Sequence, residues 1–354
     1  MSDKFTIHID GKDVQASPGQ TILEVARENG FFIPTLCYYK GTTNVGACRV
    51  CVVEVENARS LVAACAMPVN PGMKIKTDTE RVQNARRLVV ELLLASGDHN
   101  CLTCEKNGDC ELQDLVYKLG IDSPRFNIDP PGYDIEDTNS MITRDLNKCI
   151  LCGRCVRVCN EIQVNEVLDF SMRGSRSKVG PAFDTDYISS NCYFCGECVD
   201  ACPVGALTFK GARFQGRPWE IEKVKTTCAY CGVGCQMDLN IHDGKIIKVT
   251  GNREHGAPNY GSLCVKGRFG MNFVNHPDRL QTPLIRKGGE LQEASWDEAF
   301  DYIAHSLAAI KQTHGPDSIA GLSSARCTNE ENYVFQKFMR AGIGTNNVDH
   351  CARL

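Results

Sequence analysis

Two stretches of similar sequence decide the fold: "CILCGRCVRVC" at Cys149–Cys159 and "CYFCGECVDACP" at Cys192–Pro203. Both have cysteines in the spacing C-x2-C-x2-C-x3-C, in which thiolates ligate iron–sulfur clusters. The chain has 21 cysteines in 354 residues, and its N-terminus lacks the basic and apolar regions of a secretion signal. In a reducing cytoplasm, so many cysteines predict metal sites rather than disulfides.

The paired runs are typical of a two-cluster bacterial ferredoxin, in which the fourth cysteine of each run ligates the cluster of the other run. One 4Fe–4S cluster is therefore expected on Cys149, Cys152, Cys155 and Cys202. The second is expected on Cys192, Cys195, Cys198 and Cys159. Only the second run is followed by the usual proline, because Asn160 takes that place in the first.

A cysteine group near the N-terminus has the spacing C-x10-C-x2-C-x13-C. It suits a 2Fe–2S cluster with the ligands Cys37, Cys48, Cys51 and Cys65. Soft thiolates also bind zinc, which is the alternative here. The long first gap differs from plant ferredoxins and resembles the N-terminal module of respiratory complex I large subunits and of iron-only hydrogenases.

The next group lies in "GDHNCLTCEKNGDC" and resembles the His-ligated 4Fe–4S cluster of the same families. The resemblance implies the ligands His99, Cys101, Cys104 and Cys110. A neutral imidazole in place of an anionic thiolate shifts the reduction potential through the net charge of the cluster. His99 stands two residues before Cys101, closer than the family histidine does. An ordinary loop histidine is the alternative.

A fifth group has the spacing C-x2-C-x3-C-x28-C and fits one more 4Fe–4S cluster, with the ligands Cys228, Cys231, Cys235 and Cys264. The five groups together use 19 of the 21 cysteines and one histidine. Cys327 and Cys351 are left over, and we expect both to be small buried residues.

The sequence around the fifth group resembles the molybdopterin oxidoreductases. The resemblance rests on "TTCAYCGVGCQMDLNIHDGKIIKVTG", "GSLCVKGRFG", "HPDRLQTPLIRK" and "SWDEAFDYIA". Within that family it is closest to the catalytic (alpha) subunit of molybdenum- or tungsten-dependent formate dehydrogenase. The resemblance implies a metal held between two pterin–guanine dinucleotides, with a 4Fe–4S cluster close by.

The same resemblance assigns roles to three further residues. Lys266 matches the lysine between that cluster and one pterin, where a cation stabilises the negative charge of a passing electron. Its alternative is an exposed surface lysine. The loop Ser323–Asn332 precedes a helix, so Arg326 and Asn329 are candidate contacts to a pterin or nucleotide phosphate. An ordinary strand–helix turn is the alternative.

The last stretch of the chain, "SSARCTNEENYVFQKFMRAGIGTNNVDHCARL", runs in that family into the selenocysteine or cysteine that ligates the metal. The resemblance therefore implies a selenocysteine at the position after Leu354, with the chain truncated at a UGA codon. The 354-residue chain would then lack the metal-ligating residue and be inactive alone. An engineered truncation and a genuine short electron-transfer subunit are the alternatives.

The expected fold is α+β with several domains. We expect a β-grasp 2Fe–2S ferredoxin-like domain at 1–78, a His/Cys-ligated 4Fe–4S domain at 79–137, a two-cluster ferredoxin domain at 138–215, a molybdopterin oxidoreductase 4Fe–4S domain at 221–276, and the incomplete start of a molybdopterin-binding α/β domain at 277–354. The stretch from Ile121 to Thr138, rich in Pro, Asp and Gly, indicates a linker.

Local signals place several elements. Alternating apolar residues before Asp10-Gly11 predict a hairpin, and Thr21 with Glu24 predicts a capping box. Further helices are expected at Thr79–Ala95, after Ser295 and at Glu330–Ala341, with a strand at Ser318–Ser324. The helix after Ser295 would bury the apolar face formed by Ala299, Ile303, Leu307 and Ile310. Residues 346–349 suggest a buried turn or strand.

These motifs predict an iron–sulfur electron-transfer front half of a formate dehydrogenase catalytic subunit. Electrons would pass between a pterin-bound metal that interconverts formate and CO2 and a partner carrier. The expected partners are a flavin- and NAD(P)-binding subunit, a hydrogenase-type iron–sulfur subunit or ferredoxin. The alternatives are a non-catalytic iron–sulfur relay subunit and a hydrogenase- or complex I-related subunit, although complex I large subunits are expected to lack a matched pair of ferredoxin runs.

Composition excludes other classes. The net charge is −4, with 39 Lys and Arg against 43 Asp and Glu, so no basic surface for nucleic acid is indicated. The longest apolar stretch, Leu88–Ser96, contains Glu91 and is shorter than the ~20 residues a membrane span needs. No dinucleotide-binding glycine fingerprint precedes a helix. We expect a cytoplasmic protein without a membrane span.

Overall fold

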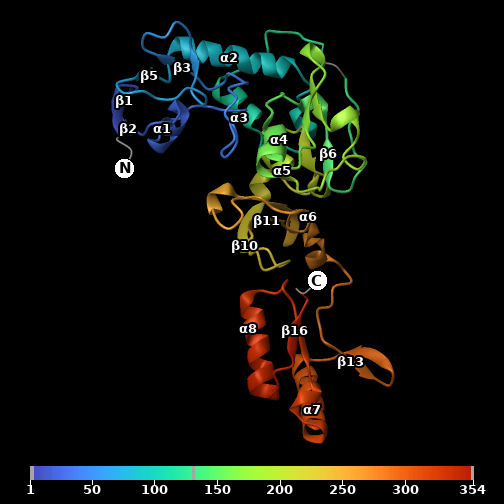
Figure 1. The fold of residues 1–354 in the computed structure, drawn as a ribbon. Coiled ribbons are helices and arrows are strands. Elements are labelled where there is room, and N and C mark those ends of the chain that lie inside the picture. Colours follow the sequence, from blue (N-terminus) through green and yellow to red (C-terminus); the bar gives the residue numbers. More distant parts are fainter. Residues whose placement is uncertain (1–3, 130–131, 352–354) are drawn as a thin grey trace. The chain divides into compact units, whose positions relative to one another are not determined.

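The computed structural model describes residues 4–129 and 132–351. The chain divides into two compact units, Met1–Ile221 and Glu222–Leu354, each of which is described by itself (Figure 1). The expected selenocysteine lies beyond the described residues. Helices and strands are mixed in both units, which confirms the α+β content. No helix in the described part of the chain is both long and apolar enough to cross a membrane.

The first unit begins with a mixed five-stranded sheet in the order β2-β1-β5-β3-β4. Its strands are β1 (Phe5–Ile9), β2 (Lys12–Ala16), β3 (Val52–Val55), β4 (Val62–Ala63) and β5 (Lys74–Lys76). The predicted hairpin is confirmed: β1 and β2 are antiparallel, and Asp10 and Gly11 both have positive φ, as a tight hairpin turn with the twist of the strands requires. β1 and β5 are parallel.

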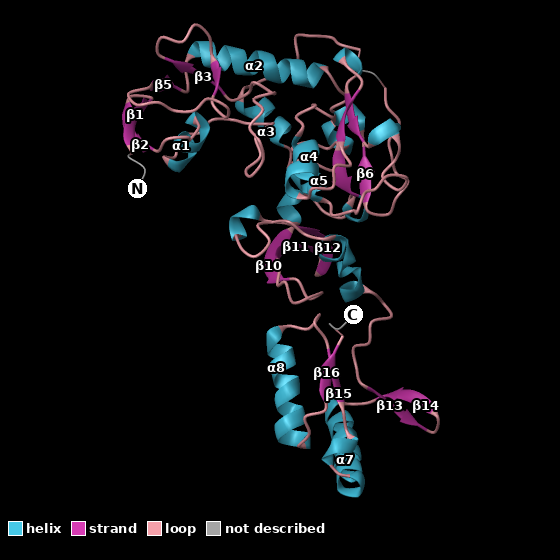
Figure 2. Cartoon of the chain, viewed as in Figure 1, coloured by secondary structure: helices cyan, strands magenta, loops and turns pink. Residues whose placement is uncertain are grey.

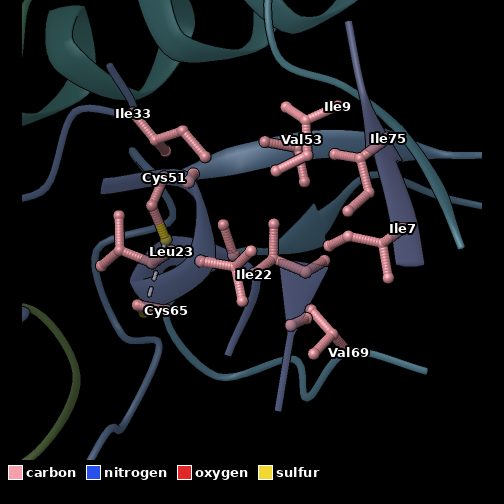
Figure 3. Close-up of a cluster of buried hydrophobic side chains, with 14 of the residues drawn as sticks. Ile7, Ile9, Ile22, Leu23, Ile33, Cys51, Val53, Cys65, Val69 and Ile75 are labelled. Carbon is pink, nitrogen blue, oxygen red and sulfur yellow. Dashed lines mark hydrogen bonds between the residues drawn. The ribbon is translucent and has the colours of Figure 1, made fainter. Parts of the chain in front are cut away.

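Helix α1 (Ile22–Glu28) supplies the apolar residues that cover this sheet. The predicted capping box is present, because Thr21 accepts from the Glu24 backbone and the Glu24 carboxylate accepts from the Thr21 backbone. Ile22 and Leu23 are fully buried against Ile7, Ile9 and the other residues of one core. Figure 3 shows that Cys51 and Cys65 lie at the edge of this core, so the cysteine loops are attached directly to a packed domain.

Two helices and a pair of short antiparallel strands continue the first unit. Their bounds are α2 (Glu80–Ala95), α3 (Glu111–Lys118), β6 (Ile142–Arg144) and β9 (Leu207–Phe209). Thr79 caps α2 as predicted, since its side chain accepts from the Val82 backbone. Arg86 of α2 is buried and donates to the carbonyl of Val52 at 2.9 Å, which ties the helix to strand β3.

The two ferredoxin-like runs form matching short helices, α4 (Arg154–Arg157) and α5 (Glu197–Ala201). Each begins after a glycine with positive φ, Gly153 or Gly196, so the equal cysteine spacing folds into equal backbone geometry. The two helices contact each other (Figure 1). A second short hairpin, β7 (Asp169–Ser171) with β8 (Lys178–Gly180), lies between the runs in the sequence.

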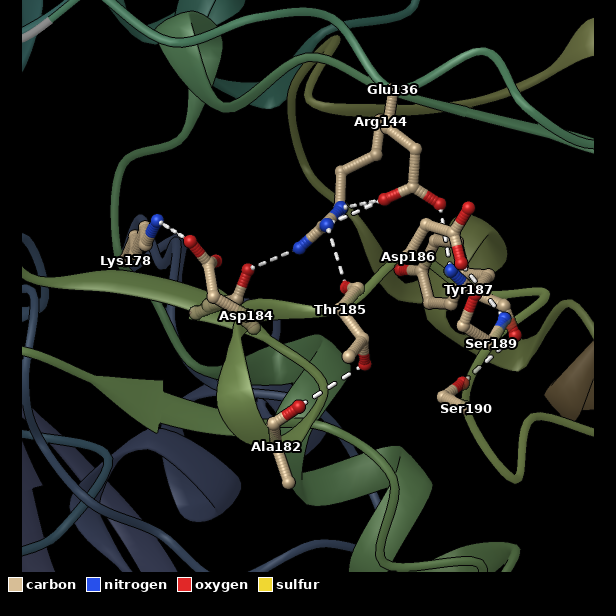
Figure 4. A network of polar contacts seen from close by, with 11 residues as sticks. Glu136, Arg144, Lys178, Ala182, Asp184, Thr185, Asp186, Tyr187, Ser189 and Ser190 are labelled. Carbon is tan, nitrogen blue, oxygen red and sulfur yellow. Dashed lines mark hydrogen bonds and ion pairs between the residues drawn. The ribbon is translucent and has the colours of Figure 1, made fainter.

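The expected linker from Ile121 to Thr138 contains no helix or extended strand in its described residues, yet its end is firmly anchored. Glu136 and Arg144 form a buried ion pair at 2.5 Å, and Arg144 also donates to the carbonyl of Val179 at 3.0 Å. The second carboxylate oxygen of Glu136 accepts from the Tyr187 backbone (Figure 4). This part of the stretch therefore belongs to the packed core around the two runs.

The described part of the second unit contains a three-stranded antiparallel sheet, a hairpin, a parallel strand pair and the α-helices α6, α7 and α8, which Figure 2 shows coloured by secondary structure. Their bounds are β10 (Glu222–Thr227), β11 (Gln236–His242), β12 (Lys245–Thr250), α6 (Val265–Phe269), β13 (Leu284–Lys287), β14 (Glu290–Glu293), α7 (Trp296–His314), β15 (Gly321–Ser323), α8 (Asn329–Lys337) and β16 (Val348–His350). The helix and strand positions predicted for residues 295–341 are confirmed within a few residues.

Two burial predictions for this unit are wrong. Ser295 caps α7 as expected, but Ile303 on its apolar face is 51% exposed and only Ala299 of the helix is buried. The end of the chain does form a strand, β16, which pairs in parallel with β15. Its residues Asp349 and His350 are nevertheless exposed.

Candidate metal centres

The first cysteine group is brought together by two loops of the N-terminal domain. The Sγ atoms of Cys51 and Cys65 are 3.4 Å apart. The thiols of Cys48 and Cys65 donate to Cys37, which lowers the pKa of Cys37, and the same bonds raise the pKa values of the two donors. Hydrogen bonds therefore link the four thiols in one chain, Cys48–Cys37–Cys65–Cys51. Cys37, Cys51 and Cys65 are buried and Cys48 is half-buried.

The second group lines a cavity of about 470 Å³. All four predicted ligands, His99, Cys101, Cys104 and Cys110, contribute to its wall, together with Lys106 and Lys148. Burial lowers the pKa of His99 and so favours the neutral imidazole, which is the form that ligates metals. One ring nitrogen, Nε2, lies 3.1 Å from the carbonyl of Leu93, which orients the ring. The short spacing to Cys101 therefore does not keep His99 away from the cysteines.

Gly205 provides the close backbone approach that this cavity needs. A Cβ atom at this position would come nearer than 3.0 Å to the Sγ of Cys104 and to 3.3 Å from the side chain of Lys148. Only glycine leaves room for the Cys104 sulfur here. Val204 lines both this cavity and the one formed by the first ferredoxin-like run, so the two candidate centres share a wall.

The exchanged pairing of the ferredoxin-like runs agrees with the geometry. A second, smaller cavity is lined by one full ligand set, Cys149, Cys152, Cys155 and Cys202, and otherwise mainly by apolar residues. Burial raises the pKa of Cys149 to about 11 and that of Cys152 to about 12. Thiols in so dry a site ionise when a bound cation supplies compensating charge, so the donor set fits an iron–sulfur cluster.

The other ligand set of the pair is also assembled. Burial raises the pKa of Cys192, and the neighbouring thiols Cys195 and Cys159 raise it further. The pKa of the buried Cys198 is raised by burial and by Cys195, Cys192 and Cys159, with a smaller contribution from Cys202 of the other set. Cys159 comes from the first run, so it stands among the cysteines of the second, as the exchange predicts.

The fifth group lies in the second unit, around the start of β11 and α6. The backbone N–H of Cys228 donates to the carbonyl of Cys235 at 2.8 Å, and Cys264 immediately precedes α6. Burial raises the pKa of Cys228, and Cys264 and Cys231 raise it further, which shows that the thiols are neighbours. Cys231 and Cys264 are exposed, so this centre is more open than those of the ferredoxin-like runs.

The structure places the three predicted pterin contacts near this fifth group without joining them into one site. Lys266 is exposed on α6, next to Gly267, whose Cβ position lies 3.5 Å from the Sγ of Cys228. Arg326 is exposed in the loop before α8, and Asn329 is exposed at the first position of that helix. That loop does reach the cysteines, because Gly232 donates to the carbonyl of Ala325 at 3.1 Å.

The prediction that the two remaining cysteines are buried is wrong. Cys327 is half-buried and Cys351 is exposed. The Sγ of Cys351 lies 3.2 Å from the hydroxyl of Ser324, and this hydrogen bond lowers the pKa of Cys351. Cys351 thus lies beside the loop before α8 rather than in a core.

Sequence reasoning missed the residues that join the candidate centres. Arg154 is 4% exposed and forms a bidentate pair with Glu111, the residue after Cys110, at 2.5 and 2.7 Å. Arg157 is similarly buried and reaches the loop of Cys37. The only signal in the sequence is that the first run has arginines where the second has Glu197 and Asp200.

Two of the candidate centres are arranged around cavities rather than single points. Within residues 4–129 and 132–351, no group of three or more His, Cys, Asp or Glu side chains is placed to hold one metal ion. Two of the predicted ligand sets instead line cavities, and the first set forms a contact group of thiols. Soft sulfur donors around a space suit a multi-iron cluster.

Comparison with family models covers most of the chain. The matches are the 2Fe-2S iron-sulfur cluster binding domain at 2–80, the NADH-ubiquinone oxidoreductase-G iron-sulfur binding region at 86–125, the ferredoxin-like domain of NADH-quinone oxidoreductase subunit 3 at 139–208, the molybdopterin oxidoreductase Fe4S4 domain at 221–276, and molybdopterin oxidoreductase at 279–354. The third match removes our argument that the paired runs exclude a relationship to complex I.

Relatives with different names resemble almost the whole chain. It is 39% identical over 349 residues to the NADPH-Fe(3+) oxidoreductase subunit alpha of Geobacter sulfurreducens and covers 40% of that protein. It is 37% identical to an NADH-quinone oxidoreductase subunit of Rhizobium meliloti, again covering 40%. A Staphylococcus aureus protein whose name gives formate dehydrogenase as a provisional assignment is 32% identical, with 39% covered. The chain thus spans about 40% of the length of these relatives.

A solved structure also resembles part of the chain. An NAD+-reducing [NiFe]-hydrogenase in the H2-reduced state has a chain that is 36% identical, with a TM-score of 0.57, and the match covers 60% of this chain and 90% of that one. The remaining evidence comes from residues 221–354, which match the two molybdopterin oxidoreductase models. The chain therefore combines several iron–sulfur domains with the domains of the molybdopterin oxidoreductases.

Proposed function

We propose that this chain is the electron-transfer front part of a formate dehydrogenase catalytic subunit. In the complete protein, electrons would pass between a molybdenum or tungsten bis(pterin guanine dinucleotide) site, where formate and CO2 interconvert, and a partner redox subunit or ferredoxin. The chain would hold one 2Fe–2S and four 4Fe–4S clusters on the ligand sets named above. The selenocysteine after Leu354 and the cytoplasmic location stay predictions from the sequence.

The observation that carries this proposal is the assembly of the predicted ligands. Two of the predicted ligand sets, the one that contains His99 and the one that contains Cys149, were predicted from cysteine spacing and family resemblance. The members of each set line a single cavity. In the Cys149 set, Cys202 joins from the second run, tens of residues later in the sequence, and random placement of cysteines would not bring it there. The molybdopterin domains at 221–354 support a pterin-bound metal as the far end of the route.

The protein's own residues have three tasks in this function. Iron–sulfur clusters, when bound, carry single electrons. Buried walls exclude water from Cys152 and Cys198, which limits solvent reorganisation and sets the potential. Lys266, two residues after Cys264, supplies a cation beside the fifth centre. The glycines at 205 and 267 let the backbone approach the sulfur atoms closely.

The decisive experiment is metal and activity analysis of the native, full-length protein purified without oxygen. The proposal expects molybdenum or tungsten together with iron, and dye reduction that depends on formate. Selenium analysis of the same sample tests the selenocysteine. Iron without molybdenum or tungsten would instead support the relay alternative, and we would withdraw the formate dehydrogenase assignment.

A second candidate function is electron transfer in an NAD(P)H-linked oxidoreductase that does not use formate. It is favoured by the higher identity to the Geobacter and Rhizobium proteins, 39% and 37%, than to the Staphylococcus protein, 32%. The two functions are separated by the electron donor. Cluster reduction by NAD(P)H in the purified complex, with none by formate, would establish the second.

A further inference from the structure

Arg157 connects two ligand loops that are far apart in the sequence. It belongs to α4, between Cys155 and Cys159, and is only 7% exposed. One of its terminal nitrogens donates to the carbonyl of Cys37, and the same nitrogen lies 3.5 Å from the carbonyl of Cys152. A single guanidinium thus touches the backbone of two predicted ligands, one in the 2Fe–2S set and one in a 4Fe–4S set.

The other terminal nitrogen of Arg157 fixes the loop that carries Cys37. It donates to the hydroxyl of Thr42 at 2.7 Å and to the carbonyl of Thr43 at 2.8 Å. The backbone N–H of Thr43 in turn donates to the carboxylate of Glu161 at 2.6 Å. The loop is therefore held to the first ferredoxin-like run by several hydrogen bonds, and the fork of the arginine provides most of them.

The positive charge of Arg157 has no carboxylate in hydrogen-bonding contact. Its acceptors in the described chain are three carbonyls and one hydroxyl, while its Nε is buried without a partner. Guanidinium stays protonated in proteins. Burying such a charge is costly unless something compensates it, and a reduced, anionic cluster on either side would do so.

The cluster motif itself does not require this arginine. The second run has the same spacing and the same left-handed glycine before its helix, and Asp200 stands at the position equivalent to Arg157. A role in holding its own cluster would apply to both runs. Arg157 contacts the loop of Cys37, and we therefore place the reason for a basic residue in that contact.

We propose that Arg157 is a positioning residue that joins the 2Fe–2S centre to the centre on Cys149, Cys152, Cys155 and Cys202 and makes a direct electron step between them. The inference rests on the proposed function to the extent that both ligand sets hold clusters. In this step one electron leaves the reduced centre and enters the oxidised one, no bond is broken, and Arg157 keeps its proton. The Cys37 group then exchanges electrons with the ferredoxin-like module without passing through the His99 centre.

The test uses the full-length protein, loaded with iron and sulfide without oxygen, and its variants Arg157→Met and Arg157→Lys. The matched control is Arg176→Met, since Arg176 is an exposed arginine in the same unit. Iron and sulfide content report whether both clusters are present. Redox titration followed by electron paramagnetic resonance gives their potentials and spin coupling, and rapid freezing gives the rate of electron exchange.

Arg157→Met should shift both potentials to more negative values, because a nearby cation stabilises the reduced, more negative state. It should also weaken the coupling and slow the exchange. Arg157→Lys should keep the potentials closer to wild type but not the coupling, since one ammonium cannot bridge both loops as the planar fork does. Arg176→Met should change none of these values.

Unchanged potentials and coupling in Arg157→Met, with both clusters retained, would overturn the proposal. If Arg157→Met loses a cluster, the potentials and the coupling are measured in Arg157→Lys and Thr42→Val instead. Thr42→Val removes one hydrogen-bond acceptor of Arg157 and leaves the arginine in place. Wild-type spin coupling in both of these variants would then refute the proposed role of Arg157. A wild-type protein that holds no 2Fe–2S cluster would instead refute the proposed function, which iron analysis shows before any variant is compared.

Discussion

Gly205→Ala tests the assembly of the His99 centre directly. The added Cβ would stand nearer than 3.0 Å to the Sγ of Cys104, whereas heavy atoms rest at roughly 3.5–4.0 Å from each other. The sulfur or the backbone must therefore move by at least about 0.5 Å. Gly205 is buried and its backbone conformation suits any residue, so the effect is a clash and not a strained φ.

Such overpacking typically costs about 1–3 kcal/mol, which corresponds to about 5- to 150-fold weaker retention of a ligated cluster. The assay is iron content and the resonance signal of each cluster in protein loaded without oxygen. The signal of the His99 centre should be selectively reduced. Gly211→Ala is the matched control, because its Cβ would meet nothing within 4 Å. A variant Gly205→Ala with a full complement of iron and an unchanged signal would refute the reasoning.

Three further predictions concern other parts of the chain. Cys202→Ala should damage the cluster on the first run and leave that on the second; resonance spectra showing the opposite loss would exclude the exchanged pairing. His99→Cys should keep a cluster but make its potential more negative, since an anionic ligand replaces a neutral one; a redox titration without a shift would remove His99 from the ligand set. Glu136→Ala should lower the free energy of unfolding by about 3–5 kcal/mol by leaving Arg144 buried and unpaired, against less than about 1 kcal/mol for the exposed Glu56→Ala; equal denaturation midpoints for the two would contradict this.

Ligand groups and helix starts were predictable because both depend on local chain geometry. A cluster requires thiolates at set intervals along a short loop, so the spacing in each run predicts ligands such as Cys152 before any fold is known. The capping box of Thr21 and Glu24 lies within one helical turn, and its hydrogen bonds form as expected. Spacing could not predict exposure. Ile303 and Cys351 are exposed because burial depends on what packs over them.

The sequence by itself therefore identified the candidate cluster ligands and the order of the matched domains along the chain. Only the tertiary structure showed which residues connect the ligand loops of the different candidate centres. Gly205 leaves room for Cys104, about a hundred residues earlier, and Arg157 donates to the carbonyl of Cys37, 120 residues away. No local pattern encodes such contacts, because they arise when separately folded loops pack together. The physical reason is that a cysteine motif specifies its own geometry, while the path between clusters is set by the packing of buried side chains between them.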